Sequence, residues 1–259
     1  MEDAKKEMNM VIIGHVDAGK STLMGHMLVE LGEVDRHVMK KTEKLADEYG
    51  KSSFSYAFIM DEDEEERARG ITINTAQANL KTKNKNFTII DAPGHKDFIQ
   101  NMISGASQAE CAILVVDSTK GGFERGFDGG GSTKDHAILA RSLGVTQVVV
   151  AVNKLDMMDW KEERYDEIVD KLKPFLVQIG FKDQNIHFVP ISGLHGVNLH
   201  KLSTQPDKLT EWYNDENGGE DKNKIPYTLV DVLDNLKPLN KPFDRPTRVC
   251  IYDYYTSSF

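Results

Sequence analysis

One eight-residue stretch near the start of the chain constrains its fold more than any other feature. Residues 14–21 read Gly-His-Val-Asp-Ala-Gly-Lys-Ser, which matches the pattern G-x-x-x-x-G-K-[S/T]. The stretch follows an apolar run, Met8–Gly14, that is typical of a buried strand. It leads into Lys20–Leu31, where apolar residues recur at helical spacing until Gly32. A strand, a glycine-containing turn and a helix in this order predict a loop that binds phosphate groups.

The chemistry of such a loop explains the residue types at its key positions. Gly14 and Gly19 let the backbone curl so that successive N–H groups point inward at an anion. Lys20 is expected to neutralise the β- and γ-phosphates during catalysis, and Ser21 to give its hydroxyl to Mg²⁺. The candidate nucleotide-binding residues of this segment are Gly14, His15, Val16, Asp17, Ala18, Gly19, Lys20, Ser21 and Thr22.

A second apolar strand ends in an acidic motif. The run Phe87–Asp91 leads directly into Asp91-Ala-Pro-Gly94. A carboxylate that closes a strand beside a phosphate loop can hold Mg²⁺ through water, and a glycine can offer its N–H to the γ-phosphate. His95 comes next, where a residue that orients the attacking water is needed. We therefore predict water-mediated metal binding by Asp91, a phosphate contact by Gly94 and a catalytic role for His95.

A third strand, Val145–Asn153, closes in the motif Asn153-Lys-Leu-Asp156. The carboxylate of Asp156 can accept both the N1–H and the 2-amino group of guanine, a donor pair that adenine lacks. It should therefore select GTP over ATP. The stem of Lys154 would cover the base, and Asn153 would tie this loop to the phosphate loop.

A turn after the next apolar strand, Ile186–Ile191, completes the predicted guanine site. It consists of Ser192, Gly193 and Leu194, and it would offer a backbone N–H to the guanine oxygen. Ser-Gly is also ordinary turn chemistry. The evidence for a nucleotide site is instead the order of the four motifs. Each motif lies at the carboxyl end of its own strand, where ligands of parallel α/β sheets bind.

A long charged segment precedes the second motif and ends in Gly70-Ile-Thr-Ile73. Thr72 is the candidate for a second hydroxyl ligand of Mg²⁺ that also senses the γ-phosphate and helps to place the water. A segment that the γ-phosphate orders and hydrolysis releases is a known switching device. The acidic run Asp61–Glu66 lies in this segment and reads as a solvated face.

Apolar runs alternate with helix-length amphipathic segments over most of the chain. This alternation predicts an α/β fold, a P-loop NTPase with a doubly wound, mostly parallel sheet. An additional edge strand is expected to pair with the second motif's strand across a turn, and one glycine-rich segment reads as a mobile loop. The strands are predicted at 8–14, 73–81, 87–91, 111–117, 145–153 and 186–191, the helices at 20–31, 96–105, 132–143 and 161–180, and the two loops at 50–70 and 121–131.

Composition limits the partners and the compartment. The chain has 259 residues with 32 Lys+Arg and 41 Asp+Glu, a net charge of −9, so broad nucleic-acid binding is unfavourable and no DNA contact is expected. Cys111 and Cys250 read as small buried hydrophobes of a reducing compartment. No secretory signal or membrane-spanning window is found, which predicts a cytoplasmic protein. The protein is expected to be a monomer.

The four motifs and the switch segment resemble those of one family, the translational GTPases of the elongation factor 1-alpha group. They read G-H-V-D-A-G-K-S, E-R-A-R-G-I-T, D-A-P-G-H and N-K-L-D. Further stretches are similar to the HBS-like ribosome-rescue GTPases of that group, which act with Pelota. These stretches are Leu23–Leu28, Gly50–Ala57, Ser142–Gln147, Ser192–Leu194, Leu209–Tyr213 and Arg245–Cys250.

The resemblance implies roles for further residues. Val16 and Ile71 match the apolar pair that flanks the catalytic histidine of this family and keeps it from the water until the ribosome repositions it. Asp17 matches an aspartate linked to monovalent-cation binding. The family fold also implies a G domain over residues 1–240, followed at 241–259 by a linker and the first strand of a β-barrel domain, with Thr247–Tyr255 as that strand.

The resemblance implies a GTPase that uses GTP, GDP and Mg²⁺ and meets the GTPase centre of the ribosome with a Pelota-type partner, in rescue of stalled ribosomes and mRNA surveillance. Elongation factor 1-alpha, which delivers aminoacyl-tRNA, and peptide release factor 3 are alternatives within the group. The GTPase subunit of sulfate adenylyltransferase shares the same motifs and is an alternative of another class. A GTP-binding scaffold without hydrolysis is disfavoured because Thr72 and His95 are both present.

Overall fold

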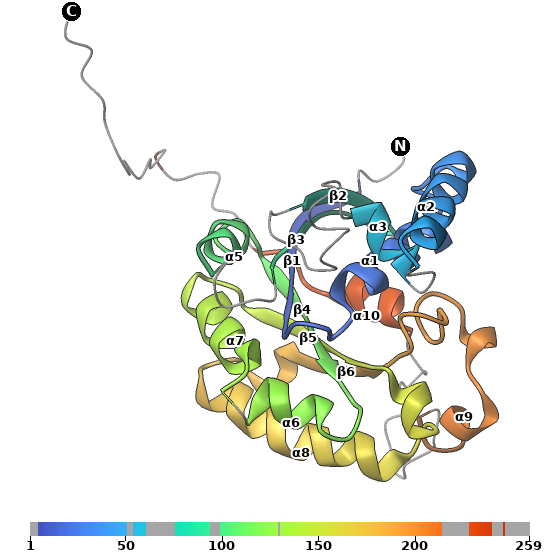
Figure 1. Ribbon diagram of the computed structural model, residues 1–259. Helices are drawn as coiled ribbons and strands as arrows, with labels where there is room; N and C mark the ends of the chain where they lie inside the picture. The colour runs from blue at the N-terminus through green and yellow to red at the C-terminus, as the bar shows by residue number, and fades with distance from the viewer. Residues whose placement is uncertain are drawn as a thin grey trace, which may run out of the picture.

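A six-stranded sheet forms the centre of the protein (Figure 1). The computed structural model describes residues 5–50, 54–60, 76–93, 99–128, 130–213, 228–239 and 246. The strand order is β2-β3-β1-β4-β5-β6, and every neighbouring pair is parallel except β2 with β3. The strands are β1 (Lys6–Gly14), β2 (Ala76–Lys81), β3 (Lys85–Asp91), β4 (Cys111–Asp117), β5 (Gln147–Asn153) and β6 (Ile186–Pro190). The predicted doubly wound, mostly parallel sheet is confirmed, including β2 as the antiparallel edge strand.

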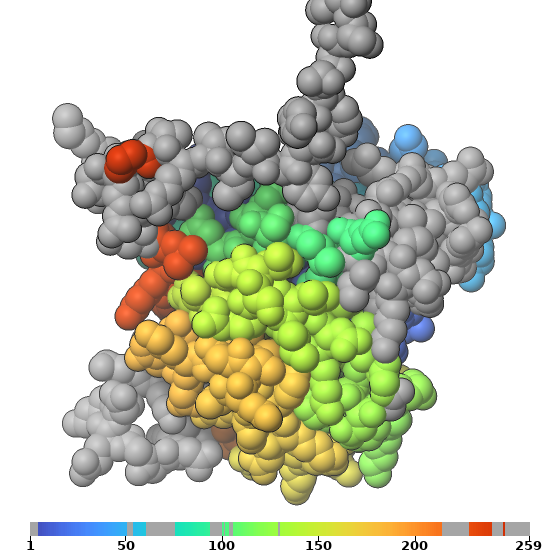
Figure 2. Space-filling view, turned by 90° about the vertical axis from the view of Figure 1, so that its left-hand side faces the viewer, coloured from blue at the N-terminus to red at the C-terminus, as the bar shows by residue number. Residues whose placement is uncertain are grey.

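Helices cover both faces of the sheet. On one face α1 (Lys20–Glu30) and α10 (Leu229–Asn235) pack over one apolar cluster, and on the other face a second cluster lies under four helices. Figure 2 looks onto this second face, where α5, α7 and α8 (green, yellow-green and gold) form a layer. Alternate residues of a strand point to opposite faces, so each internal strand must be apolar on both sides. The four helices are α5 (Ile99–Ala106), α6 (Gly122–Phe127), α7 (Ser132–Ser142) and α8 (Glu162–Gln178).

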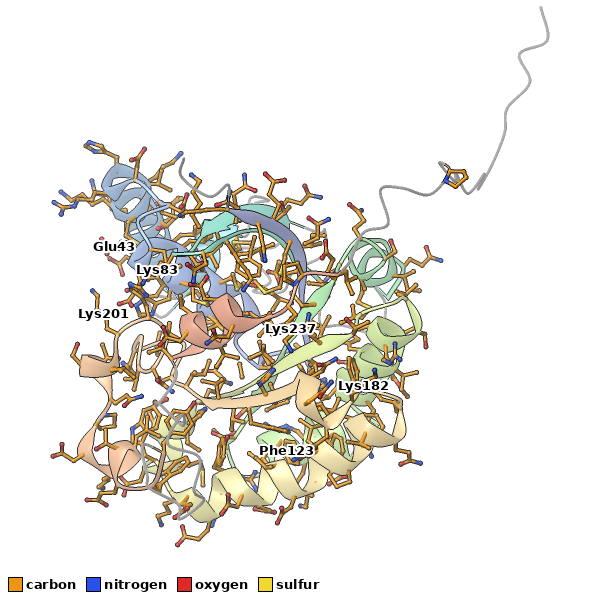
Figure 3. All side chains as sticks on the ribbon, turned by 180° about the vertical axis from the view of Figure 1, so that it is seen from behind. Glu43, Lys83, Phe123, Lys182, Lys201 and Lys237 are labelled. Carbon is orange, nitrogen blue, oxygen red and sulfur yellow. The ribbon has the colours of Figure 1, made fainter. Side chains whose placement is uncertain are left out.

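The glycine-rich segment 121–131 was expected to be a mobile loop, and this expectation is wrong for its first half. Residues Gly122–Phe127 form α6 because Phe123 and Phe127, one turn apart, are buried in the second apolar cluster and stack with ring centroids 5.2 Å apart. Figure 3 shows Phe123 on the side of the sheet that α8 covers. Burial of two aromatic side chains outweighs the low helix propensity of glycine.

Several elements lie around this core. They include a short helix inside the predicted charged loop 50–70, which forms because Ala57, Phe58 and Met60 are buried. These elements, none of which the sequence patterns indicated, are α2 (Arg36–Glu48), α3 (Ala57–Met60), α9 (Asp207–Tyr213) and the 3₁₀ helices η3 (Leu155–Met158), η4 (Asp183–Asn185) and η5 (Leu202–Thr204). The acidic run Asp61–Glu66 and the predicted strand Thr247–Tyr255 lie outside the described residues.

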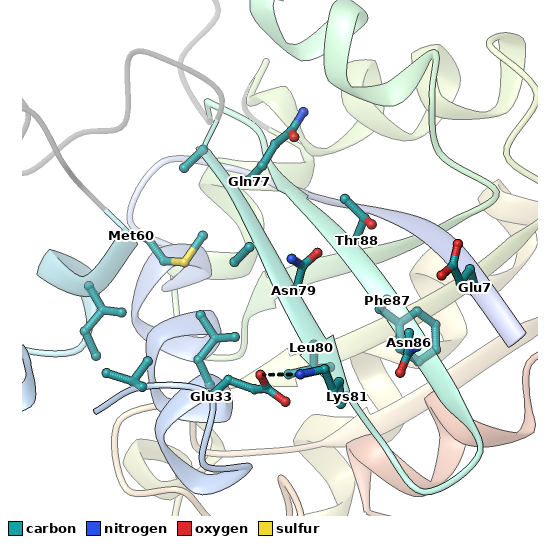
Figure 4. Close-up of a pocket in the computed structure, with 15 residues that line it drawn as sticks. Glu7, Glu33, Met60, Gln77, Asn79, Leu80, Lys81, Asn86, Phe87 and Thr88 are labelled. Carbon is teal, nitrogen blue, oxygen red and sulfur yellow. Dashed lines mark ion pairs between the residues drawn. The ribbon is translucent and has the colours of Figure 1, made fainter. Parts of the chain in front are cut away.

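A groove of about 590 Å³ runs along the edge strand β2 (Figure 4). It lies between β2, β3 and the elements α1 and α3, and an ion pair of 3.6 Å joins Lys81 and Glu33 beside it.

No helix of the described part of the chain is both long and apolar enough to cross a bilayer. Cys111 is fully buried in the apolar cluster under α1 and α10, and burial raises the pKa of its thiol to about 12. Both observations fit the predicted small core residue. Cys250 lies outside the described ranges.

Candidate nucleotide-binding site

The predicted motifs meet at one edge of the sheet. Because β1, β3, β4, β5 and β6 run parallel, their carboxyl ends lie at the same edge. In the strand register Asp91 pairs with Ile12 near the end of β1, and Asn153 pairs with Asp117 at the end of β4. Ligands of such sheets bind in the crevice at this edge. The fold therefore brings together the phosphate loop, the acidic motif and the two predicted guanine loops.

The phosphate loop joins β1 to α1 in a backbone shape that requires glycine at two places. Gly14 and Gly19 have φ angles of 146° and 92°, which favour glycine. Packing adds a second requirement, because a Cβ on Gly14 would collide with the carbonyl of Val115 and one on Gly19 with the side-chain amide of Asn153. Gly14 thus allows the close approach of β4, and Gly19 that of the Asn153 side chain, in addition to the curl of the loop.

Lys20 begins α1 and its amine stays within the loop. The residue is 7% exposed, and its Nζ donates to the carbonyl oxygens of Gly14 at 3.2 Å and His15 at 3.0 Å. A lysine amine held at the mouth of a curled loop is a mobile point charge that can exchange these carbonyls for phosphate oxygens. Lys20 therefore lies at the amino end of α1, as predicted.

Helix α7 supports the loop from behind, a contact that the motif does not indicate. The backbone N–H of Gly14 donates to Nδ1 of His136 at 3.3 Å, and the N–H of Ser132 donates to Nδ1 of His15 at 3.3 Å. Burial, and after it the charge of Lys20, lower the pKa of His136 to about 4. The ring is therefore neutral near pH 7 and its Nδ1 can accept the Gly14 proton.

The two predicted metal residues of the described chain lie together. Ser21 Oγ donates to Oδ2 of Asp91 at 3.1 Å, and Asp91 is fully buried. A serine hydroxyl that gives its proton to a carboxylate presents an electron-rich oxygen, and Mg²⁺ prefers such oxygen ligands while it keeps several waters. The pair therefore fits Mg²⁺ bound directly by Ser21 and through water by Asp91.

Asn153 joins three loops through one buried side chain. Its Nδ2 donates to the carbonyl of Ala18 in the phosphate loop at 2.8 Å. Its Oδ1 accepts from the N–H of Lys154 at 2.8 Å and from the N–H of Gly193 at 2.8 Å. The side chain is 3% exposed, so these contacts are shielded from water. Asn153 thus forms the predicted tie to the phosphate loop and extends it to the turn after β6.

Replacement of Asn153 by alanine should weaken both the fold and the site. Three backbone groups would lose a buried partner, and each unsatisfied group costs about 1–3 kcal/mol, partly recovered by water. We expect urea unfolding to show a loss of about 2–4 kcal/mol and GDP to dissociate faster. Asn185→Ala is the matched control, since the side-chain amide of Asn185 donates to the carbonyl of Thr146 at 3.1 Å, away from this edge. Equal losses in the two variants would contradict the role of Asn153.

Lys154 reaches from the guanine loop to two neighbours. Its Nζ donates to the carbonyl of Asp17 at 2.5 Å and to Oδ2 of Asp117 at 2.8 Å. Burial alone would raise the pKa of Asp117, but hydrogen bonds from Lys154 and Thr119 lower it below its usual value, so the carboxylate stays charged. Sequence reasoning missed Asp117, although an acidic residue that closes an apolar strand was the signal that identified Asp91.

Asp156 lies in η3 with its carboxylate open to a ligand. Its side chain is 25% exposed, and Nε2 of His195 lies 3.7 Å from Oδ2. Leu194, in the turn after β6, is 42% exposed, and a backbone bridge between Ser192 and Val197 closes this turn. The two predicted guanine contacts, the Asp156 carboxylate and a backbone N–H of the turn 192–194, thus come from adjacent loops.

Four predicted site residues lie outside the described ranges: Ile71, Thr72, Gly94 and His95. Val16, the described half of the predicted apolar pair, is half-buried beside Asp17 on the phosphate loop. Among the described residues, no cluster of three or more histidine, cysteine or acidic side chains could hold a metal by itself.

Comparison with known proteins agrees with this geometry. Residues 5–238 match the family model "Elongation factor Tu GTP binding domain". The chain is 51% identical over 253 residues to Protein HBS1 of Drosophila melanogaster, covering 98% of this chain and 36% of that protein. It is 44% identical over 255 residues to elongation factor 1-alpha of Yarrowia lipolytica, covering 98% of this chain and 55% of that protein. The chain thus spans about a third to a half of the curated relatives it matches.

Solved structures give the same result. The Ski7 GTPase-like domain of S. cerevisiae bound to GTP has a TM-score of 0.73 and 25% identity, over 88% of this chain and 49% of that one. Sup35 complexed with GMPPNP has a TM-score of 0.62 and 32% identity, over 90% of this chain and 46% of that one. The chain belongs to the translational GTPases that carry the elongation factor Tu GTP-binding domain, in the group that includes HBS1 and elongation factor 1-alpha.

Proposed function

We propose that this chain is the GTP-hydrolysing domain of an HBS-like factor that acts in the cytoplasm with a Pelota-type partner on stalled ribosomes. The assignment to the HBS-like subtype is supported by sequence identity. The chain is 51% identical to Protein HBS1 and 44% identical to elongation factor 1-alpha, in each case over 98% of its length. The site geometry supports the chemistry, because phosphate-binding and guanine-binding elements share one edge of the sheet.

In this proposal each residue performs one step of a GTP switch. Lys20 and the loop N–H groups bind the phosphates, and Asp156 with Leu194 binds guanine. Ser21 and Thr72 would hold Mg²⁺ directly and Asp91 would hold it through water, and the ion would supply neutralisation of phosphate charge. Gly94 contacts the γ-phosphate, while His95 and Thr72 place the water. Val16 and Ile71 hold His95 back until the ribosome repositions it, so turnover should be slow without ribosomes.

The catalytic assignment is tested by His95→Ala. We expect the variant to bind GTP and GDP as the wild type does but to lose ribosome-stimulated hydrolysis, because phosphoryl transfer to water needs a residue that orients the attacking water. Single-turnover hydrolysis of radiolabelled GTP, with and without ribosomes, measures this. Stimulation that survives the substitution would show that His95 does not place the water.

The subtype is tested by the partner of the GTP form. The full-length gene product, loaded with a non-hydrolysable GTP analogue, is offered Pelota, peptide release factor 1 or aminoacyl-tRNA in separate pull-downs. Retention of Pelota alone is the expected result. Retention of release factor 1 or of aminoacyl-tRNA instead would assign the protein to termination or elongation, and co-purification with a sulfurylase would assign it to sulfate activation.

A further inference from the structure

A buried histidine outside the four motifs contacts the turn that follows β6. His26 lies on α1, six residues after Lys20, and is 8% exposed. Its Nδ1 lies 2.8 Å from the carbonyl oxygen of Gly193. A carbonyl oxygen can only accept, so the imidazole carries its proton on Nδ1 and donates it.

This hydrogen bond fixes the direction of another donor. The carbonyl of Gly193 and the N–H of Leu194 belong to one planar peptide group, and every described peptide bond is trans. In a trans peptide the C=O and the N–H point in opposite directions. A donor that holds the Gly193 oxygen against α1 therefore turns the Leu194 N–H away from α1. Donation to the oxygen also polarises the peptide and strengthens its N–H as a donor.

The peptide on the other side of Gly193 is held as well. The N–H of Gly193 donates to Oδ1 of Asn153 at 2.8 Å, and Asn153 in turn holds the phosphate loop. A Cβ on Gly193 would lie 3.2 Å from Asn153 Oδ1 and 3.3 Å from Leu23 Cα, so the turn sits close against α1. The two peptide groups that flank Gly193 are thus anchored by different elements, β5 and α1.

The His26 ring is itself clamped. It stacks on the ring of Tyr56 with centroids 4.0 Å apart and an interplanar angle of 7°. The neighbouring Gly25 lets the Tyr56 main chain pack directly on α1, since a Cβ there would collide with the Tyr56 carbonyl. On another side, a Cβ on Gly196 would lie 2.7 Å from His26 Cε1. The ring therefore cannot swing away from the Gly193 oxygen without disturbing its neighbours.

We propose that His26 is a positioning residue for guanine recognition: through the Gly193 carbonyl it aims the Leu194 N–H at the 6-oxygen of the base. The proposal rests on the assignment of the turn at 192–194 to the guanine site. It also makes α1 responsible for both ends of the nucleotide, because Lys20 at its amino end serves the phosphates and His26 serves the base.

The chemistry of asparagine and glutamine gives a sharp test. An asparagine amide can place its N–H₂ near the position of Nδ1, whereas the longer glutamine places it near Nε2, where it misses the Gly193 oxygen. We expect His26→Gln to weaken GDP binding about three- to tenfold, the range of a single hydrogen bond, and His26→Asn to retain most of the affinity. Fluorescence titration of the full chain gives the dissociation constants.

A second ligand separates positioning from general packing. In 6-thio-GDP a sulfur, a weaker acceptor than oxygen, replaces the 6-oxygen while the N1–H and the 2-amino group stay. Wild type should bind GDP more tightly than 6-thio-GDP, and His26→Gln should reduce this preference, because the aimed N–H is lost. His37→Gln, on the exposed part of α2, is the control and should change neither constant.

The outcomes are distinct. Equal weakening of GDP and 6-thio-GDP in His26→Gln, or no change in either, would overturn the positioning role. No preference in the wild type would remove the assignment of Leu194 to the 6-oxygen, and with it this proposal. No binding of GDP to the wild type would instead contradict the proposed GTPase function. If His26→Gln does not fold, loss of the GDP preference in the folded His26→Asn would likewise overturn the role.

Discussion

An Asp156→Asn variant is expected to lose guanine nucleotides and to gain xanthine nucleotides. The carboxylate of Asp156 has only acceptors, which match the N1–H and the 2-amino group of guanine. Asparagine keeps one acceptor and adds a donor, which matches the N1–H and the 2-oxygen of xanthine. Loss of a charged, paired contact in a site built for it should weaken GDP binding on the order of a hundredfold or more.

The structure makes this experiment easy to interpret. The Asp156 side chain is 25% exposed and lies 3.7 Å from Nε2 of the exposed His195, so the substitution should leave the fold intact. Competition of GDP and xanthosine diphosphate for a fluorescent nucleotide measures the preference. Asp159→Asn is the matched control, because this carboxylate lies three residues later, is 63% exposed and pairs with Lys208 at 2.6 Å. Unchanged GDP affinity in Asp156→Asn would exclude this residue from guanine recognition.

Much of the sheet could be predicted from the sequence because its strands are covered on both faces. Cys111–Asp117 is buried along nearly its whole length, and such strands read as continuous apolar runs. The edge strand was also predictable, because a short turn joins it to β3, the strand that carries the acidic motif and with which it pairs. The motifs then located the site, because the carboxyl ends of parallel strands must share one edge.

Elements that depend on contacts between distant segments could not be predicted. Helix α6 has two glycines among its six residues and forms because Phe123 and Phe127 are buried under α8. It is further held by Arg164 of α8, whose Nη1 donates to Glu124 at 3.0 Å. The local sequence of these six residues does not indicate the contacts with α8, so the glycine content favoured the prediction of a loop.

The supporting residues of the site were hidden for a related reason. His136 and His26 contact backbone groups that lie 122 and 167 residues away in the chain, and a histidine on a helix carries no sign of its partner. Motifs name the residues that touch the ligand, because ligand chemistry restricts their type and spacing. The type and spacing of the residues that hold the loops in place depend on tertiary contacts, so these residues could be identified only from the structure.

A Lys20→Met variant should lose affinity for the phosphates while it keeps its preference for guanine. Methionine retains an apolar stem in this buried position but removes the charge that now donates to the Gly14 and His15 carbonyls. Truncation of one partner of a buried charge pair costs about 2–5 kcal/mol, so GDP binding should fall at least about thirtyfold. GMP has no β-phosphate for Lys20 to reach, so its affinity should change much less.

Isothermal titration with GDP and GMP measures this effect, and Lys171→Met, on the exposed face of α8, is the control. Equal loss of GDP and GMP would mean that the loop had collapsed rather than lost a charge. The double variant Lys20→Met/Asp156→Asn asks whether the two ends of the nucleotide are read independently. If Asn153 only holds the phosphate and guanine loops in one fixed frame, the two free-energy losses should add, since distant sites without a shared partner behave independently. A sum that departs from additivity by more than about 0.5 kcal/mol would show that this frame transmits changes from one end of the nucleotide to the other.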